Sequence, residues 1–396
     1  MYKTKLGLKL MDRLSTKDDN KMIPVYGITT GVIGIVLIIL GLIFHSIILG
    51  GLGFSLILIG LVIGISLNWL GYFGTGIGFL GMIFILYVLI KGVINLIISP
   101  VTIPTVTPLL PGIQLAPGIP VLSFWHWIIG ILIIACIHEF SHGLYARLNK
   151  VPLKSSGFAF IGPLLAAFVE PNEKVMSKKR KRKQMHILVA GPLSNIITGI
   201  LFFTIGTLVL TPIVSSGLEF QGLTVVSLTN NSTLNTTNIT GETIIAIDGV
   251  ALKNSTAIES ILLSKNPGDT VNLRTLNNGY NVSLSQSESN SSKASLGIYA
   301  SAYYGHIPPG VKVGFWFIEL FFWLYVISLG VGLFNLLPLG PVDGGRMFYV
   351  ASLAIFKKER NAKKVYKIMT WICIILILIN LLPFILNFLS YLFSLF

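Results

Sequence analysis

The segment SFWHWIIGILIIACIHEFSHGLYA, residues 123–146, decides the architecture of this chain. It is almost entirely apolar, and a helix needs about 20 apolar residues to cross the hydrocarbon core of a bilayer. Near its end lies the pentapeptide His138-Glu139-Phe140-Ser141-His142, which places three ionisable side chains within an apolar helix. Because ionisable side chains at membrane depth are costly, such residues usually have a function.

The pentapeptide has the pattern H-E-x-x-H, which is typical of zinc hydrolases. Two histidines four residues apart lie on one helical face, where both can bind one Zn²⁺, and the glutamate can take a proton from metal-bound water. The pattern therefore predicts His138 and His142 as metal ligands and Glu139 as the catalytic base. An alternative is that the two histidines only form hydrogen bonds between helices.

The composition indicates a polytopic α-helical membrane protein. Hydrophobic residues make up 53% of the 396 residues, charged residues make up 11%, and the mean hydropathy is +0.80. Soluble domains carry about 25% charged residues. Stretches long enough to span a bilayer predict about seven transmembrane helices, at residues 26–46, 50–69, 76–98, 123–146, 187–213, 313–337 and 368–394.

The uneven distribution of basic residues predicts an orientation. Segments 1–25, 147–186 and 346–367 contain 23 of the 29 Lys and Arg residues, and a seven-helix count places all three on one side. Because short basic loops stay in the cytoplasm, we expect a multi-pass protein of the cell membrane with a cytoplasmic N-terminus and an extracytoplasmic C-terminus. The net charge of +14 does not indicate nucleic acid, and the basic run 178–183 is better explained by lipid headgroups.

A polar insert interrupts the apolar pattern at residues 217–305, which are rich in Ser, Thr, Asn and Gly. Runs typical of strands occur at 223–228, 243–247, 270–275 and 280–284, with one helical stretch at 255–264. The phrase Gly241-Glu242-Thr243-Ile244-Ile245-Ala246-Ile247-Asp248-Gly249 resembles the second half of a PDZ domain. We therefore expect a small β-rich, PDZ-like extracytoplasmic domain that recognises substrate tails, with a simple spacer as the alternative.

A zinc site with two histidines needs a third protein ligand and leaves one position open to water. Asp343 is the best candidate, because it follows a break in the sixth predicted helix. Backbone that is not helical is tolerated at membrane depth only where it is buried in protein or lines a wet cavity. Asp343 and the histidine pair are both expected near the cytoplasmic ends of their helices; the alternative is that Asp343 caps the helix that begins at Gly344.

Taken together, these motifs resemble those of the site-2 proteases, which are intramembrane zinc metalloproteases. The resemblance covers residues 123–394 and is carried by His138 to His142, Ala190-Gly191-Pro192-Leu193-Ser194-Asn195, and Asn335-Leu336-Leu337-Pro338-Leu339-Gly340-Pro341-Val342-Asp343-Gly344-Gly345. It implies that His138, His142 and Asp343 bind zinc and that Glu139 is the base. It also implies that Asn195 and Asn335 lie near the scissile carbonyl, although both could instead form hydrogen bonds between helices.

Residues 151–171 are apolar but interrupted by Gly and Pro, and they resemble the membrane-dipping hairpin of the same family. A helical peptide bond is shielded, so the substrate must be held in an extended form. A strand at Gly157 to Ile161 could pair with the unwound substrate by strand addition. The alternative is a loop that rests on the lipid surface.

The sequence thus predicts a linear organisation around the catalytic segments. Residues 1–25 form a cytoplasmic N-terminal segment, residues 26–98 form three helices without catalytic groups, and residues 99–122 form an outer Pro-rich loop. The two catalytic membrane segments are residues 123–213 and 312–396, and the insert between them is residues 217–305.

The predicted function is hydrolysis of peptide bonds in single-span membrane proteins, with Zn²⁺ as cofactor, as in regulated intramembrane proteolysis. Three alternatives remain open. A non-catalytic scaffold could use the same fold to bind membrane proteins, and a membrane metalloprotease could cut soluble peptides. A transporter is the third, although the helices lack the extra carboxylates and the inverted repeat expected of one.

Overall fold

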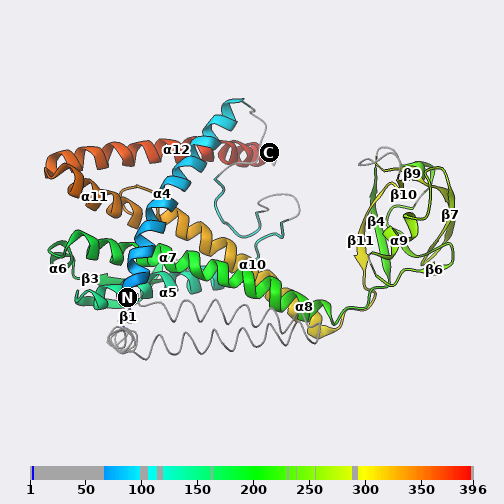
Figure 1. The fold of residues 1–396 in the computed structure, drawn as a ribbon, viewed down its shortest axis with the longest axis horizontal. Coiled ribbons are helices and arrows are strands. Elements are labelled where there is room, and N and C mark those ends of the chain that lie inside the picture. Colours follow the sequence, from blue (N-terminus) through cyan, green and yellow to red (C-terminus); the bar gives the residue numbers. More distant parts are fainter. Residues whose placement is uncertain are drawn as a thin grey trace. The chain divides into compact units, whose positions relative to one another are not determined.

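The computed structural model describes residues 2–3, 67–98, 106–113, 119–161, 164–229, 232–237, 239–254, 256–287 and 293–393. The chain folds into two units (Figure 1). One contains Met1–Pro212 and Trp316–Phe396, and the other contains Ile213–Phe315.

Five helices are long and apolar enough to cross a membrane in the described residues. They are α4 (Leu67–Ile98), α5 (Phe124–Leu148), α7 (Lys181–Ile205), α10 (Pro309–Asn335) and α12 (Glu359–Phe393). Helix α7 continues through a π-helical turn at Gly206–Leu210 into α8 (Thr211–Ser215). This confirms helices at the last five predicted spans. The predicted span 26–46 and most of 50–69 lie outside the described residues.

The predicted break between residues 69 and 76 was wrong, because α4 begins at Leu67 and runs through this region without interruption. Two glycines in this region, Gly71 and Gly74, are packing positions. A Cβ at Gly71 would lie 2.7 Å from His186 Nδ1, and one at Gly74 would collide with Leu193, so both glycines let α4 approach α7 closely. Small residues at such crossings are typical of membrane helices.

Helix α7 is the central element of the helical unit. It packs against α4, α5 and α11 (Asp343–Phe356), and most of its residues from Gln184 to Leu193 are buried. Ile187, Leu188 and Val189 join Leu336 and Met347 in the main apolar core. A helix surrounded in this way can present functional groups to several neighbours, as the next section describes.

The Gly- and Pro-containing segment after α5 forms a hairpin, as predicted. Strands β2 (Leu153–Ile161) and β3 (Leu164–Pro171) pair in antiparallel register, with Ser156 opposite Val169, and α6 (Glu173–Ser177) follows. The sheet has a third member, because β1 (Tyr2–Lys3) pairs with β2 at Phe158 and Gly157. The edge that we expected to receive a substrate is therefore occupied there by the N-terminus of the same chain.

The second unit is β-rich. Strands β11 (Ile298–Tyr303), β4 (Gly222–Leu228), β5 (Thr243–Ile247), β7 (Thr270–Thr275) and β8 (Gly279–Ser283) lie in that order in one antiparallel sheet, and β6 (Val250–Ala251) pairs with β5. A short pair, β9 (Ser285–Gln286) and β10 (Ala294–Ser295), a 3-10 turn at Thr233–Thr236 and α9 (Ala257–Leu262) complete it. The four predicted strands are confirmed, and their apolar residues, including Ile244, Ile247 and Leu273, form a separate core.

The turn between β5 and β6 is fixed by Asp248 and Gly249, which both have positive φ angles, of 50° and 79°. Such angles at both central residues are typical of a tight hairpin turn. Asp248 accepts hydrogen bonds from the backbone N–H of Asn272 in β7 and from Nζ of Lys265 in the loop between α9 and β7. These two bonds lower the pKa of the Asp248 carboxyl, with the Lys265 bond as the larger cause.

Candidate metal centre

Helix α5 carries the H-E-x-x-H pentapeptide on its last turns. The helix begins after Ser123, whose side-chain oxygen accepts a hydrogen bond from the His126 N–H, as is usual for a helix N-cap. His138 and His142 are both buried and lie one turn apart on the same face. Nδ1 of His142 lies 2.7 Å from the carbonyl oxygen of Ile187 in α7, which fixes the orientation of this ring.

Asp343 reaches the histidines through the break between α10 and α11. The chain turns back sharply at Leu336 to Val342, and the two glycines after Asp343 make this possible. A Cβ at Gly344 would collide with the Leu336 carbonyl, and one at Gly345 would collide with the Leu339 carbonyl. Val342 occupies the N-cap position of α11, so the Asp343 side chain does not cap this helix and instead points to the histidines.

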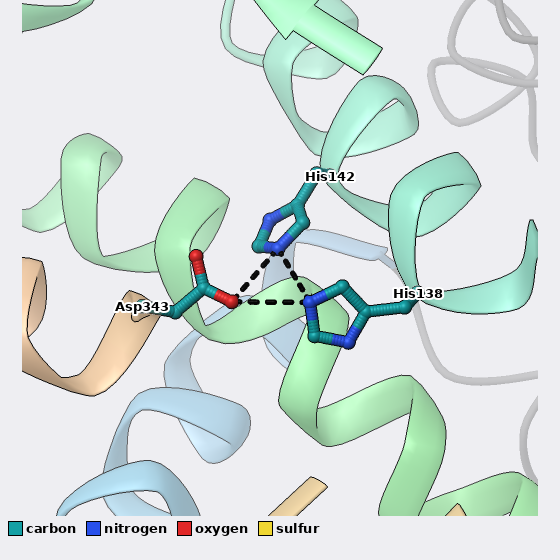
Figure 2. Close-up of side chains that lie close together, drawn as sticks. All are labelled: His138, His142 and Asp343. Carbon is teal, nitrogen blue, oxygen red and sulfur yellow. Dashed lines mark hydrogen bonds and ion pairs between the residues drawn. The ribbon is translucent and has the colours of Figure 1, made fainter. Parts of the chain in front are cut away.

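Figure 2 shows the three side chains pointing at one common position. Oδ2 of Asp343 lies 3.1 Å from Nε2 of His138 and 3.1 Å from Nε2 of His142, and the two nitrogen atoms are 3.2 Å apart. Two atoms bound to a tetrahedral zinc ion at about 2.0 to 2.1 Å lie about 3.3 Å from each other. The triangle of donor atoms therefore has the size that such an ion requires, and these residues are the group that could hold one.

The chemistry of the donors also fits a cation. Nδ1 of His142 faces a carbonyl oxygen and therefore carries a hydrogen, so in the neutral ring that binds a metal Nε2 presents a lone pair toward His138 and Asp343. Two lone pairs and a carboxylate that face one another in a buried site repel. A divalent cation at their centre removes this repulsion and leaves a fourth coordination position for water.

Gly191 of α7 makes room for this arrangement. A Cβ at this position would collide with Nε2 of His142 and would lie 2.5 Å from Nε2 of His138, the two atoms that face the metal position. The glycine lies in the Ala190 to Asn195 motif, four residues after Ile187. Only a residue without a side chain allows α7 to pass this close to the donor atoms.

Asn195 lies behind His138 rather than in the open part of the site. It is fully buried, and its side-chain amide is 3.0 Å from Nδ1 of His138. The contacting atom is the amide nitrogen Nδ2, and among the described residues the buried amide oxygen has no hydrogen-bond partner. When His138 binds a metal through Nε2, Nδ1 carries the hydrogen, and a 180° rotation of the amide brings its oxygen into place to accept it. The contact therefore orients His138. Partners of this kind, beyond the ligands themselves, are common in metal sites.

Glu139 borders a cavity of about 240 Å³ that the metal position also faces. Its Oε2 atom accepts a hydrogen bond of 3.0 Å from the backbone N–H of Val169 in β3. Asn335 lines the same cavity, and its amide nitrogen donates to the Val331 carbonyl of its own helix, which leaves its oxygen as an additional polar group. The cavity thus joins the donor triangle, one carboxylate and a strand.

Comparison with known proteins shows the family of this chain. The model of peptidase family M50 matches residues 126–379, which contain all three donor residues. The chain belongs to peptidase family M50. This is the site-2 protease family, so the resemblance seen in the sequence motifs is confirmed.

Two other similarities are more limited. An uncharacterized protein of Methanocaldococcus jannaschii is 26% identical over 236 residues, which are 59% of this chain and 59% of that protein, so the chain spans about three-fifths of that relative's length. The PDZ domain of an SdrC-like protein from Listeria monocytogenes is 23% identical, with a TM-score of 0.18, and covers 20% of this chain and 88% of that domain chain.

Several contributors to this M50 site were absent from the sequence-based prediction. Gly191 lay within a motif that we used, but its closeness to the ligand atoms depends on how α5 crosses α7. The Val169 N–H and the Ile187 carbonyl are backbone groups, and no residue type signals them. A signal existed only for Gly191, because a glycine within an apolar helix often marks close packing.

Gly191→Ala is expected to abolish metal binding, because the added methyl group would lie against both ligand nitrogen atoms. Zinc content of the purified protein, measured by atomic emission, should fall from about one ion per chain to near zero. Gly199→Ala on the same helix is the matched control, since its Cβ would meet the side chains of Leu329, at 3.1 Å, and Ser328, at 3.4 Å, and neither ligand nitrogen atom. Equal zinc content in both variants would contradict this account of Gly191.

Asn195→Ala is expected to weaken zinc binding by about 10- to 100-fold, because His138 loses the partner that orients its ring. The affinity can be measured by competition with a fluorescent chelator. Asn335→Ala serves as the comparison, since Asn335 lines the cavity without contacting a ligand side chain. If Asn335→Ala lowered the affinity as much as Asn195→Ala does, the assigned role of Asn195 would be wrong.

Proposed function

We propose that this protein is a zinc endopeptidase that hydrolyses peptide bonds within the transmembrane segments of membrane proteins. One observation carries the proposal: the donor triangle of His138, His142 and Asp343 shares a cavity with Glu139, in a unit built of membrane-length apolar helices. Membership of family M50 supports the metalloprotease class. A binding scaffold would need neither the open metal position nor the carboxylate next to it.

The residues divide the chemistry among them. His138, His142 and Asp343 would hold Zn²⁺, which lowers the pKa of bound water and polarises a carbonyl group. Glu139 accepts the proton of the attacking water and then delivers it to the leaving amine. In the resting structure Glu139 is held by the Val169 N–H, so the base is already positioned at the cavity. Asn335 lines the cavity wall, where its side-chain oxygen can accept a hydrogen bond from the substrate backbone.

The substrate strand is proposed to add to the outer edge of β3. The Val169 N–H donates to Glu139, so this backbone group points away from β2 and toward the cavity. Among the described strands, none pairs with this edge of β3, whereas β1 covers β2. Extension of the substrate along β3 exposes its carbonyl groups, which a helix would shield.

The remaining parts of the proposal concern the setting. We place the N-terminus in the cytoplasm and the C-terminus outside the cell membrane, on the basis of the basic residues in segments 1–25, 147–186 and 346–367. The β-rich unit is then an extracytoplasmic PDZ-like domain that recognises substrate tails by strand addition. The substrates are single-span membrane proteins trimmed by an earlier protease, as in regulated intramembrane proteolysis.

The decisive experiment compares wild-type protein with Glu139→Gln in liposomes that contain a panel of single-span reporter proteins. Removal of the base should lower cleavage by about 10²- to 10⁴-fold, while zinc content stays the same because Glu139 is not a ligand. Zinc bound without cleavage by either form would favour the scaffold alternative. Cleavage of soluble peptides but of no membrane reporter would favour the soluble-peptide protease.

Val169→Pro tests the role of β3 without changing Glu139 itself. Proline has no backbone N–H, so this variant loses the hydrogen bond that Val169 donates to Glu139. We expect cleavage of a reporter to fall about tenfold or more with zinc content unchanged. Val169→Ala keeps the N–H and should cleave at nearly the wild-type rate. Similar rates for the proline and alanine variants would show that the substrate does not use this edge.

A further inference from the structure

A second and larger cavity, of about 640 Å³, lies where α6, α7, α11 and α12 meet. Five basic side chains line it. Lys181 lies in α7, Arg346 lies in α11, Lys357 directly follows α11, and Lys363 and Lys367 lie in α12. The proposed proteolytic reaction uses none of these lysines. Their concentration around one hollow calls for a separate explanation.

The charges in this cavity are not balanced. Its two carboxylates are already engaged, since Glu173 binds Arg346 at 2.6 Å and Glu359 binds Lys363 at 2.7 Å. In the described part of the chain, no carboxylate pairs with the three other lysines, Lys181, Lys357 and Lys367. An anion bound between these lysines would relieve their mutual repulsion.

The rest of the cavity suits an amphiphilic molecule. Its floor is apolar and buried, and is formed by Met176, Leu188 and Val350. Beyond Lys367 the surface of α12 becomes apolar: Ile368 follows directly and Trp371 lies one turn further, and their side chains are 50% and 64% exposed. An anionic group held by the lysines would therefore lie directly beside a surface that hydrocarbon chains can cover.

We propose that this cavity binds the phosphate headgroup of an anionic phospholipid. Basic cavities between membrane helices are typical sites for such headgroups, and lysines at helix ends extend toward the interface. Lysine ammonium groups act as flexible point charges, which suits a phosphate of variable orientation better than a planar carboxylate. Free phosphate offers the same chemistry without the hydrocarbon chains.

The position of this site would link it to the metal centre. Met176, Leu188 and Arg346 line both cavities, and Arg346 lies one helical turn after Asp343. Tyr366, on the lipid-site wall, donates a hydrogen bond of 2.8 Å to the Gly340 carbonyl in the turn that precedes Asp343. A bound phosphate would compete with Glu173 for Arg346. The binding claim itself does not require the proteolytic function and can be tested without it.

The test uses full-length protein in detergent, titrated with dioleoyl phosphatidylglycerol or dioleoyl phosphatidylcholine and followed by native mass spectrometry. The cavity variant is Lys181→Gln/Lys367→Gln. The matched control is Lys178→Gln/Lys364→Gln, which removes the same charge from the residue that follows α6 and from α12, at positions that do not line the cavity. Lys181→Arg/Lys367→Arg preserves the charge, and circular dichroism checks that all variants are folded. Inorganic phosphate is added as a competitor.

We expect phosphatidylglycerol to bind the wild type and the arginine variant, and the cavity variant to lose about 30-fold in affinity while the control stays unchanged. Displacement of bound phosphatidylglycerol by inorganic phosphate would support recognition of the phosphate group, whereas binding of inorganic phosphate without binding of phosphatidylglycerol would identify free phosphate as the ligand and overturn the phospholipid assignment. Equal losses in both glutamine variants, or equal binding of phosphatidylcholine, would overturn the proposal. The first result would mean general surface attraction, and the second would mean that the charge is not recognised.

Discussion

The convergence of two imidazoles and a carboxylate at one buried point is the constraint on which the helical unit depends. Their donor atoms lie 3.1 to 3.2 Å apart, and without a cation this arrangement brings lone pairs and negative charge together in an apolar environment. Burial of unpaired charge is costly, so the site is stable only when it is neutralised. The surrounding elements must therefore hold the three donors at the spacing that suits a metal ion, and must do so from segments 200 residues apart.

Helix α7 meets most of this requirement with residues at intervals of four. The Ile187 carbonyl accepts from His142, Gly191 leaves space for the donor atoms, and Asn195 contacts His138. Positions four residues apart lie above one another on a helix, so one face of α7 supplies all three contacts. The motif around Gly191 is thus part of the metal site although it contributes no ligand. A substitution on this face can disturb the metal without touching a donor residue.

The sequence was most informative where polar chemistry interrupts apolar segments. His138, Glu139, His142 and Asp343 stand out because ionisable residues are rare in membrane helices, and the hairpin was predicted from the resemblance of residues 151–171 to the membrane-dipping hairpin of the family. The gap between the predicted spans 50–69 and 76–98 was wrong, because α4 runs without a break through Gly71 and Gly74, which let it pack closely against α7. The Val169 contact with Glu139 was not predictable, because it is made by backbone and depends on how the sheet meets α5.

The arrangement of the small sheet favours one direction of strand addition. Neighbouring strands are about 4.8 Å apart, so a substrate on the outer edge of β2 would lie about 10 Å from β3, on the side away from Glu139. Strand β1 pairs with that edge at Gly157 and Phe158, opposite to the edge where the Val169 N–H meets the base. Exposed sheet edges pair readily with any extended chain. By covering the unproductive edge, the N-terminal strand leaves the proposed substrate the edge that adjoins the metal position.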